Sequence, residues 1–262
     1  MSNKAKIRED AKGLNPIDDP LFMKMSEDKD FCQEIIQVLL DDINISVIEN
    51  RPQFAARNLE GRSCILDLFC RLGNGKLVNI EVQKADDDDH QRRMRYNAAL
   101  LTTNTSNPGT KFREIHDVIV ILISKFDIFK KGKAVYHVDR MIRETNELVE
   151  NGLCEIYVNS EVDDKTKTAE LMKVFNIDDE YNDKLFPETS SRKRRYKTTE
   201  EGVNEMCEIL EKYRNEGIIE GAQKEKVNSI RALMKNLNMT AEKAMAALNI
   251  APSDFKIYIS ML

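Results

Sequence analysis

The sequence lacks the short motifs that mark several common classes of enzyme. It contains no Gly-x-x-x-x-Gly-Lys loop, no Gly-x-Gly-x-x-Gly turn and no Gly-x-Ser-x-Gly elbow, so nothing indicates a nucleotide, dinucleotide or serine-hydrolase site. Histidine is scarce, and His90, His116 and His137 are scattered without the spacing of metal ligands. We therefore expect no nucleotide cofactor and no histidine-based metal centre.

Disulfide, zinc and membrane signals are also missing. The five cysteines are odd in number and form no Cys-x-x-Cys pair, which argues against a disulfide framework or a zinc ribbon. No apolar run approaches the roughly 18 residues of a membrane span, and the polar start MSNKAKIREDAKG does not resemble a signal peptide. The composition therefore predicts a cytoplasmic protein with reduced cysteines and no membrane partner.

The charge of the chain is unevenly distributed. Its net charge of −5 argues against indiscriminate electrostatic binding to DNA. Positive charge is nevertheless gathered at residues 91–95 and 192–197, whereas residues 86–89 and 163–164 are acidic. Such segregation is what a phosphate-contacting face beside an acidic metal site requires. Taken singly, each cluster fits a solvated surface segment equally well.

The stretch from residue 63 to residue 84 has the pattern of a β-hairpin. Two runs rich in β-branched and aliphatic residues, 64–72 and 77–82, flank the tripeptide Gly-Asn-Gly at 73–75. With a loop of these three residues, stepping back along both strands sets Asp67 directly opposite Glu81. The hairpin therefore brings two acidic side chains together.

This predicted pairing needs compensation, because like charges opposite each other, with Cβ atoms about 5 Å apart, destabilise a sheet. Asp is also poorly suited to a strand interior. A divalent cation between Asp67 and Glu81 is the simplest remedy, with Gln83 on the same face two residues further on. A two-residue turn at 74–75 would instead shift the register by one residue and send the carboxylates to opposite faces.

An ordinary hairpin with one solvated face is the alternative interpretation. Asp67, Glu81 and Gln83 would then simply form the solvent-exposed side. Ile65 and Phe69 share the face of Asp67 in an alternating strand, however, so that this face is not uniformly polar. The buried side would comprise Leu66, Leu68 and Cys70.

An Asp on one strand followed by Glu-x-(Lys or Gln) on the next resembles the core of the PD-(D/E)XK nuclease superfamily. The motif Leu66-Asp67, followed by Asn-Ile-Glu-Val-Gln at 79–83, most resembles its branch of recombination-promoting nucleases, also described as transposases. Asp19-Pro-Leu-Phe22 resembles the opening motif of that family. Arg92-x-x-x-Tyr96 resembles its pattern on the next helix. The resemblance covers about residues 15–160.

The resemblance implies a metal-dependent endonuclease that hydrolyses DNA phosphodiester bonds and is linked to transposition or recombination. Mg²⁺, or alternatively Mn²⁺, would be held by Asp67, Glu81 and the Val82 carbonyl. Gln83 stands where the superfamily usually has lysine, and a neutral amide adds no positive charge and cannot act as a base. A weak or inactive nuclease fold that serves as a DNA-binding or self-association module is therefore the alternative.

Further residues are candidates for the site or for DNA. In the superfamily a carboxylate of the first helix can join the metal site, which makes Glu34 a candidate, and Asp19 competes because it belongs to the opening motif. An exposed helical Glu is, however, several times commoner than a ligand. Arginine supplies charge for phosphates and tyrosine stacks or donates a hydrogen bond, although a solvated helix face fits these residues equally well. The predicted DNA contacts are Arg92, Arg95, Tyr96, Arg192, Lys193, Arg194 and Arg195.

The order of elements predicts an α/β fold. Helical periodicity at 30–42 and 90–103 alternates with strand patterns, among which the apolar run 117–124 indicates a strand covered on both faces. The fold class expected is a restriction-endonuclease-like core, with the order helix, mixed sheet, helix and strand, followed by a C-terminal helical appendage. The other strands are expected at 45–54, 134–138 and 153–158.

The expected division of the chain follows changes in composition. Residues 1–14 resemble a flexible arm, 15–186 the nuclease-like domain, 187–199 a basic linker and 200–262 a helical appendage. Thr198 and Glu201 have the spacing of a capping box. The apolar stripe from Met206 to Leu237 could pair with a second copy of the chain, while the basic linker could bind DNA. Simple packing of these helices onto the core is at least as good an interpretation.

Overall fold

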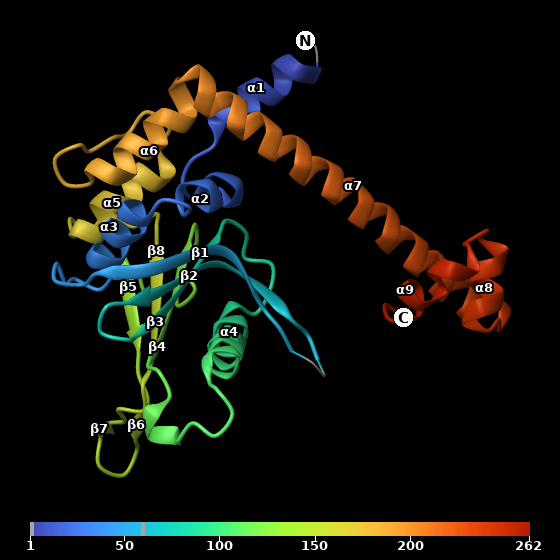
Figure 1. The fold of residues 1–262 in the computed structure, drawn as a ribbon, viewed down its shortest axis with the longest axis horizontal. Helices are drawn as coiled ribbons and strands as arrows, with labels where there is room; N and C mark the ends of the chain where they lie inside the picture. Colours follow the sequence, from blue (N-terminus) through green and yellow to red (C-terminus); the bar gives the residue numbers. More distant parts are fainter. Residues whose placement is uncertain (1–2, 59–60) are drawn as a thin grey trace. The chain divides into compact units, whose positions relative to one another are not determined.

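The computed structural model describes residues 3–58 and 61–262 and is drawn in Figure 1. The chain forms two compact units, Met1–Cys207 and Glu208–Leu262. The division falls inside one long helix, α7, which runs from Glu200 to Leu237. Each unit has a hydrophobic core of its own.

The first unit is a sheet with helices around it. Its helices are α1 (Asn3–Gly13), α2 (Asp19–Met25), α3 (Lys29–Leu39), α4 (His90–Thr105), η1 (Phe112–Glu114), α5 (Lys167–Asn176) and α6 (Pro187–Thr198). Its strands are β1 (Val47–Ala56), β2 (Cys64–Leu72), β3 (Leu77–Gln83), β4 (Val118–Ser124), β5 (Val135–Val138), β6 (Met141–Ile142), β7 (Glu147–Leu148) and β8 (Leu153–Asn159). After α7 come α8 (Ala241–Ala247), η2 (Pro252–Asp254) and α9 (Phe255–Ile259).

The main sheet is mixed and has the order β1-β2-β3-β4-β8-β5. Strands β1, β2 and β3 form an antiparallel meander, β4 and β8 run parallel to β3, and β5 closes the edge antiparallel to β8. Helix α4 connects the parallel strands β3 and β4, as a crossover must. The arrangement confirms the expected α/β core with flanking helices and a C-terminal helical part (Figure 1).

The two faces of the sheet are covered by different helices. Every residue of β4 is buried, which explains its continuous apolar sequence, because a central strand contacts a layer on each side. On one face, Met94, Ala98 and Leu101 of α4 pack against the apolar side chains of β3, β4 and β8. Helix α3 begins at the cap Asp28, which accepts hydrogen bonds from two backbone amides, and packs on β1.

The β2–β3 hairpin has the predicted register. The Leu72 amide donates to the Lys76 carbonyl at 2.9 Å, and Leu68 pairs with Ile80 further along the ladder. Gly75 has φ of +86°, a left-handed conformation that glycine adopts without strain. One step beyond the Leu68 pair, the same register places Asp67 opposite Glu81.

The predicted basic linker is instead part of the first unit. Residues 187–198 form α6, because Pro187 fits the first turn of a helix and Glu34 of α3 satisfies the free amides there. The Glu34 carboxylate accepts from the Glu188 amide at 3.0 Å and from the Thr189 amide at 2.8 Å. One face of this basic helix points into the protein, since Lys193 is fully buried.

The N-terminal arm and the predicted capping box also differ from expectation. Residues 3–13 form α1, with Ile7 and Ala11 buried, while the first two residues of the arm lie outside the described part. At the corner between α6 and α7, Thr199 rather than Thr198 caps the new helix, accepting from the Gly202 amide at 3.1 Å. A Cβ at Gly202 would clash with the carbonyl of the preceding helix, so the tight corner needs glycine.

The second unit has a small core around the last part of α7. This core contains Val227 and Ile230 of α7 with residues of α8 and α9, and Thr240 caps α8 by accepting from the Lys243 amide. The predicted apolar stripe is thus divided, since Met206 is buried in the first unit and Ile230 in the second. Among the described residues, no helix is both long and apolar enough to cross a membrane.

Candidate functional site

Asp67 and Glu81 meet where the strands β2 and β3 separate. The Asp67 carboxylate accepts a hydrogen bond from the Val82 amide at 3.0 Å, and the Glu81 carboxylate accepts one from the Asp67 amide at 3.2 Å. Side-chain oxygens therefore take the place of backbone carbonyls at this step. The sequence predicted this proximity from the hairpin loop alone.

Burial makes the two negative charges unfavourable. Glu81 is 1% exposed. Burial raises the pKa of Asp67 well above its usual range, and the nearby charges of Glu81 and Asp19 raise it further. Burial also raises the pKa of Glu81, although Arg93 and the Asn79 amide oppose this by favouring the charged form. A pair of carboxylates held in this way favours an added positive charge.

Arg93 of α4 supplies a positive charge at the site, and sequence reasoning missed it. Its guanidinium donates to Glu81 Oε2 at 2.9 Å and to Gln83 Oε1 at 3.2 Å. The inward face of α4 includes the buried Met94 and Asn97. Since Arg93 lies four residues before Asn97, helical spacing could have placed it near that face. The arginine thus stands beside the position where the superfamily usually has lysine.

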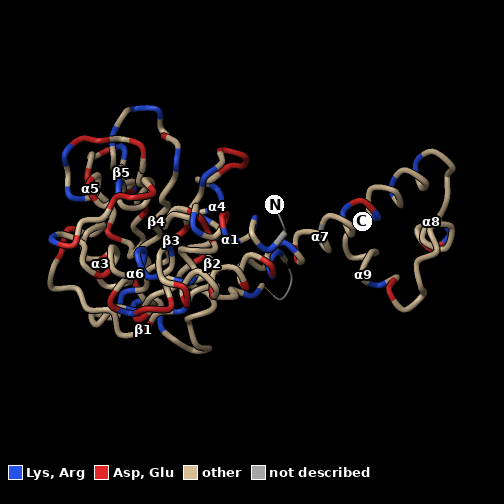
Figure 2. Tube along the Cα trace, turned by 90° about the horizontal axis from the view of Figure 1, so that it is seen from above, with Lys and Arg blue, Asp and Glu red and all other residues tan. Residues whose placement is uncertain are grey.

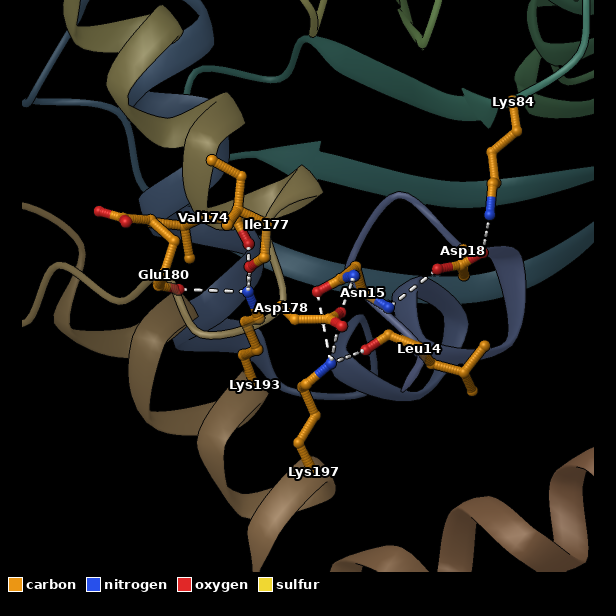
Figure 3. A network of polar contacts seen from close by, with 10 residues as sticks. All are labelled: Leu14, Asn15, Asp18, Lys84, Val174, Ile177, Asp178, Glu180, Lys193 and Lys197. Carbon is orange, nitrogen blue, oxygen red and sulfur yellow. Dashed lines mark hydrogen bonds and ion pairs between the residues drawn. The ribbon is translucent and has the colours of Figure 1, made fainter. Parts of the chain in front are cut away.

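Gln83 has a fixed orientation. Its amide nitrogen donates to the Ala85 carbonyl at 3.2 Å and to Asp87 at 3.4 Å, while its oxygen accepts from Arg93. The neighbouring Lys84 is engaged elsewhere, because its ammonium group forms an ion pair with Asp18 at 2.5 Å (Figure 3). Lys84 therefore does not replace the missing lysine in the structure.

The two further acidic candidates have different environments. Asp19 begins α2 and is close enough for its charge to raise the pKa of Asp67. Glu34 has a different role, because its carboxylate caps α6 through Glu188 and Thr189. The structure thus favours Asp19 over Glu34 as an additional acid.

The donor set suits a hard divalent cation only in part. Carboxylate oxygens of Asp67, Glu81 and the nearby Asp19 are the ligands that Mg²⁺ prefers. Among residues 3–58 and 61–262, however, no three side chains of His, Cys, Asp or Glu are already arranged as a metal site. One Glu81 oxygen is occupied by Arg93, so a cation would share or displace that contact.

A family model describing the PD-(D/E)XK nuclease family transposases matches residues 20–217, which is more than half of the chain. The chain belongs to this family. No curated protein and no solved structure gives a significant match. The matched range includes the sheet, the Asp67–Glu81 pair, α6 and the first part of α7, so the family domain extends beyond the basic segment that was expected to end it.

Within this family domain, the predicted DNA-contacting residues of α4 have unequal positions. Arg92 and Arg95 are exposed, and Arg92 pairs with Asp89 at 3.2 Å. Tyr96 has a structural role, because its hydroxyl donates to the Arg62 carbonyl and accepts from the Asn58 amide. Of the three residues predicted on α4, the two arginines are therefore the exposed ones.

The basic residues of α6 are engaged inside the nuclease-like unit. Lys193 donates to the carbonyls of Val174, Ile177 and Glu180 (Figure 3). Its predicted contact with DNA is wrong for this conformation, because the side chain is fully buried. The three arginines of the cluster form ion pairs with acidic side chains, namely Arg192 with Asp28, Arg194 with Asp183, and Arg195 with Glu205.

A basic loop that the sequence reasoning did not single out lies next to the site. It connects β4 to β5, and the Lys125 amide at its start donates to the Gln83 carbonyl at 3.0 Å. The Asp127 carboxylate accepts from three backbone amides of the loop and from the Tyr136 hydroxyl. The loop is thereby fixed, and its exposed lysines are Lys130, Lys131 and Lys133. Lys and Arg also occur in other segments, as the trace coloured by charge shows (Figure 2).

Proposed function

We propose that this transposase-family protein is a metal-dependent DNA endonuclease that hydrolyses phosphodiester bonds in transposition or recombination. The observation that carries the proposal is the Asp67–Glu81 pair, in which Glu81 is buried and Asp67 half-buried, and whose pKa values are both raised. An ordinary solvated hairpin face would leave both carboxylates in water. Burying two acids opposite each other is unfavourable unless a positively charged group binds there.

Mg²⁺, or Mn²⁺ in its place, would be held by Asp67, Glu81 and the Val82 carbonyl, with Asp19 as the additional acid. Such an ion lowers the pKa of a bound water and stabilises negative charge on the phosphate. The chain contributes the fixed positions of these oxygens. The Asp67 carboxylate is held by the Val82 amide at 3.0 Å, so this carboxylate itself needs little reorganisation when a ligand arrives.

Arg93 compensates for the lack of a lysine on β3. A lysine at position 83 would bring one positive charge to the site, and Gln83 brings none. The Arg93 guanidinium contacts both Gln83 and Glu81 and provides that charge from α4. Arginine stays protonated at any working pH; hence Arg93 would stabilise a phosphate and not act as a base.

DNA would approach between two sets of basic side chains. Arg92 and Arg95 lie on α4, and the loop of Lys130, Lys131 and Lys133 follows the strand beside Gln83. Phosphate contacts of this kind position a nucleic acid without reading its sequence. The net charge of −5 is compatible with binding limited to this part of the surface.

A DNA-binding module without efficient cleavage is the second candidate. It is favoured by the engagement of both Glu81 oxygens, which accept from Asn79, the Asp67 amide and Arg93. If the Arg93 contact persists when DNA binds, the cation has a poor site. The two candidates make opposite predictions for cleavage but the same prediction for DNA binding.

The deciding experiment incubates supercoiled plasmid with the purified protein in Mg²⁺, in Mn²⁺ and in chelator. The variants are Asp67→Asn and Glu81→Gln, with Asp163→Asn as a matched control on an exposed aspartate. Nicking by wild type and the control, but by neither site variant nor in chelator, supports the endonuclease. If intact plasmid is recovered although the protein binds it, the binding module is the better description.

Self-association through α7 stays a prediction, with a smaller surface than the sequence suggested. Part of the stripe is buried in the two cores, and the large apolar side chains still exposed along the middle of α7 include Ile218 and Ile219, at 62% and 58%. Sedimentation of wild type and of an Ile218→Gln, Ile219→Gln variant tests it. A monomer at every concentration for wild type would contradict the prediction.

A further inference from the structure

A cleft of about 660 Å³ opens beside the carboxylate pair. It lies between the beginning of β2 and the first turns of α4. Its volume falls in the range of about 300–1,000 Å³ that is typical of sites for small molecules. Four arginines line it, namely Arg62, Arg92, Arg93 and Arg95, with Cys64 and Ile65 beside them and the acidic Asp88 and Asp89 at the start of α4.

The two walls of the cleft are tied together. The Tyr96 hydroxyl of α4 donates to the carbonyl of Arg62, just before β2, and accepts from Asn58 at 3.2 Å. Within α4 itself, Asp89 caps the helix by accepting from the Arg92 amide at 3.0 Å. The Tyr96 contacts fix the opening between the strand and the helix, so the cleft is part of the folded unit.

The rim of the cleft offers free positive charge. Arg93 is engaged with Glu81, and Arg92 is paired with Asp89. In the described part of the chain, the guanidinium groups of Arg62 and Arg95 have neither an ion-pair partner nor a hydrogen-bond partner, and both residues are exposed. Two unpaired guanidinium groups at one opening suit a phosphate, which arginine binds through two parallel hydrogen bonds.

Apolar surface lies next to this charge. Ile65 on β2 is 57% exposed and Cys64 is its half-buried neighbour. A lone exposed isoleucine is unremarkable, but here it lines a cleft together with arginines. Apolar side chains and guanidinium planes are the surfaces on which proteins hold an unstacked base.

The cleft is continuous with the catalytic candidates. Arg93 lines it and donates to Glu81 at 2.9 Å. Ile65 lies two residues before Asp67 on the same strand, and thus on the same face of the sheet. A ligand on Ile65 would therefore have its neighbouring phosphate beside the carboxylates.

We propose that this cleft receives one unpaired nucleotide next to the phosphate that is cut. Its base would lie against Ile65, and its own phosphate would bind Arg62 and Arg95. A concave site of this size suits a single nucleotide, whereas the stacked bases of a duplex are inaccessible unless one is extruded. The inference rests on the proposed nuclease function and deepens it: the substrate is DNA with a single-stranded, gapped or mismatched segment.

The test measures binding in chelator, so that cleavage does not interfere. Fluorescence anisotropy compares an intact duplex with the same duplex carrying one mismatch, and with its single strand. The mismatched duplex and the single strand should bind roughly tenfold more tightly or better, because their bases are already wholly or partly unstacked. A 2-aminopurine at the mismatch should become brighter on binding. Equal affinity for all three DNAs would overturn the inference.

Two substitutions locate the effect. Ile65→Ala and Arg95→Ala should remove most of the preference for unpaired DNA, whereas Arg113→Ala, an exposed arginine outside the cleft, should keep it. Circular dichroism checks that each variant is folded. If the two cleft variants keep the preference while folded, the nucleotide site lies elsewhere and the inference fails.

Failure of the inference and failure of the nuclease proposal have different signatures. Metal-dependent plasmid cleavage without any preference for unpaired DNA would contradict the nucleotide site in the cleft and support the nuclease proposal. A preference for unpaired DNA that depends on Ile65 and Arg95, with no cleavage in any metal, would contradict the nuclease proposal and support a binding site for unpaired DNA.

Discussion

Asp67 and Glu81 each accept a hydrogen bond from a backbone amide of the strand that carries the other. The Val82 amide donates to Asp67 at 3.0 Å, and the Asp67 amide donates to Glu81 at 3.2 Å. This reciprocal arrangement fixes both carboxylates at the point where the hairpin opens. It also brings two negative charges together where Glu81 is buried and Asp67 half-buried, and the first prediction follows from this.

Replacing Asp67 by Asn should stabilise the metal-free protein at neutral pH. Burial and the charge of Glu81 raise the pKa of Asp67 in the folded state above its usual value of about 3.8. The folded state therefore binds this proton more tightly than the unfolded state, and stability falls as pH rises above that value. Thermal denaturation of Asp67→Asn in chelator should show a gain on the order of 1 kcal/mol at pH 7, which shrinks as pH falls towards 4.

The control for this prediction is an aspartate whose pKa is shifted in the opposite direction. The hydrogen bond from Lys165 lowers the pKa of Asp163 to about 2, so Asp163→Asn should not stabilise the protein at neutral pH. Adding Mg²⁺ should raise the melting temperature of wild type, because binding to the folded state adds about 2.7 kcal/mol to the free energy of unfolding at a hundredfold excess over the dissociation constant. If Asp67→Asn gains as much from the ion, Asp67 is not a ligand.

Removing the Arg93 charge should destabilise the protein and make it depend on metal. Arg93→Gln leaves the Glu81 carboxylate buried without its ion pair, and we expect a loss of about 1–3 kcal/mol in urea denaturation. A divalent cation should restore part of this loss, because in the variant it can bind the carboxylate oxygen of Glu81 that Arg93 occupies in wild type. The exposed neighbour is a control: Arg92→Gln should change stability by less than about 0.5 kcal/mol. Equal effects of the two substitutions would show that the Glu81 contact is unimportant.

Lys193 should make stability depend on pH in the alkaline range. Burial, together with the charge of Lys197, lowers the pKa of Lys193 to about 8 from a usual 10.5. The unfolded state then binds more protons between these values, so the contribution of this residue to stability increases as pH rises from about 8 to 10.5. The difference in unfolding free energy between wild type and Lys193→Met should follow this trend.

At pH 7 the same substitution should still destabilise the protein. The carbonyls of Val174, Ile177 and Glu180 would lose their donor, and each buried unsatisfied group costs about 1–3 kcal/mol. Arg194→Met, at the half-buried neighbouring position, is the control. A flat pH dependence of the Lys193→Met difference would contradict the assignment.

The lysine loop should contribute to DNA affinity without sequence preference. Changing Lys130, Lys131 and Lys133 to Gln should weaken binding to every DNA sequence. The slope of log affinity against log salt should fall by about 1 for each phosphate that a lysine no longer neutralises. A control with the same charge change replaces Lys111, Lys165 and Lys184. Identical salt slopes for the two triple variants would place the DNA elsewhere.

The local part of the site could be predicted from the sequence. The loop at 73–75 determines which residues of the two strands face each other, so the opposition of Asp67 and Glu81 required no knowledge of the rest of the fold. The buried strand β4 was equally accessible, because a continuous apolar run of that length is typical of a strand covered on both faces. Local chemistry and short-range geometry were sufficient in both cases.

The contributions of distant elements could not be predicted in the same way. The basic sequence of α6 suggested a solvated linker, but Lys193 is buried because the free carbonyls at the end of α5 bind its ammonium group. Glu34 looked like a surface residue until α6 was placed on it. Such pairings depend on how helices far apart in sequence pack, and hydrophobic periodicity contains no information about them.

The packing of α6 determines where the chain can be cut for expression of a fragment. A protein shortened after Phe186 would lose the donor for three carbonyls in the last turn of α5 and the segment after it, and Glu34 would have no helix to cap. A fragment that ends at Cys207, the end of the first unit, keeps both. The shorter boundary, which composition favours, would yield an unstable product whose lack of activity says nothing about Asp67 or Glu81.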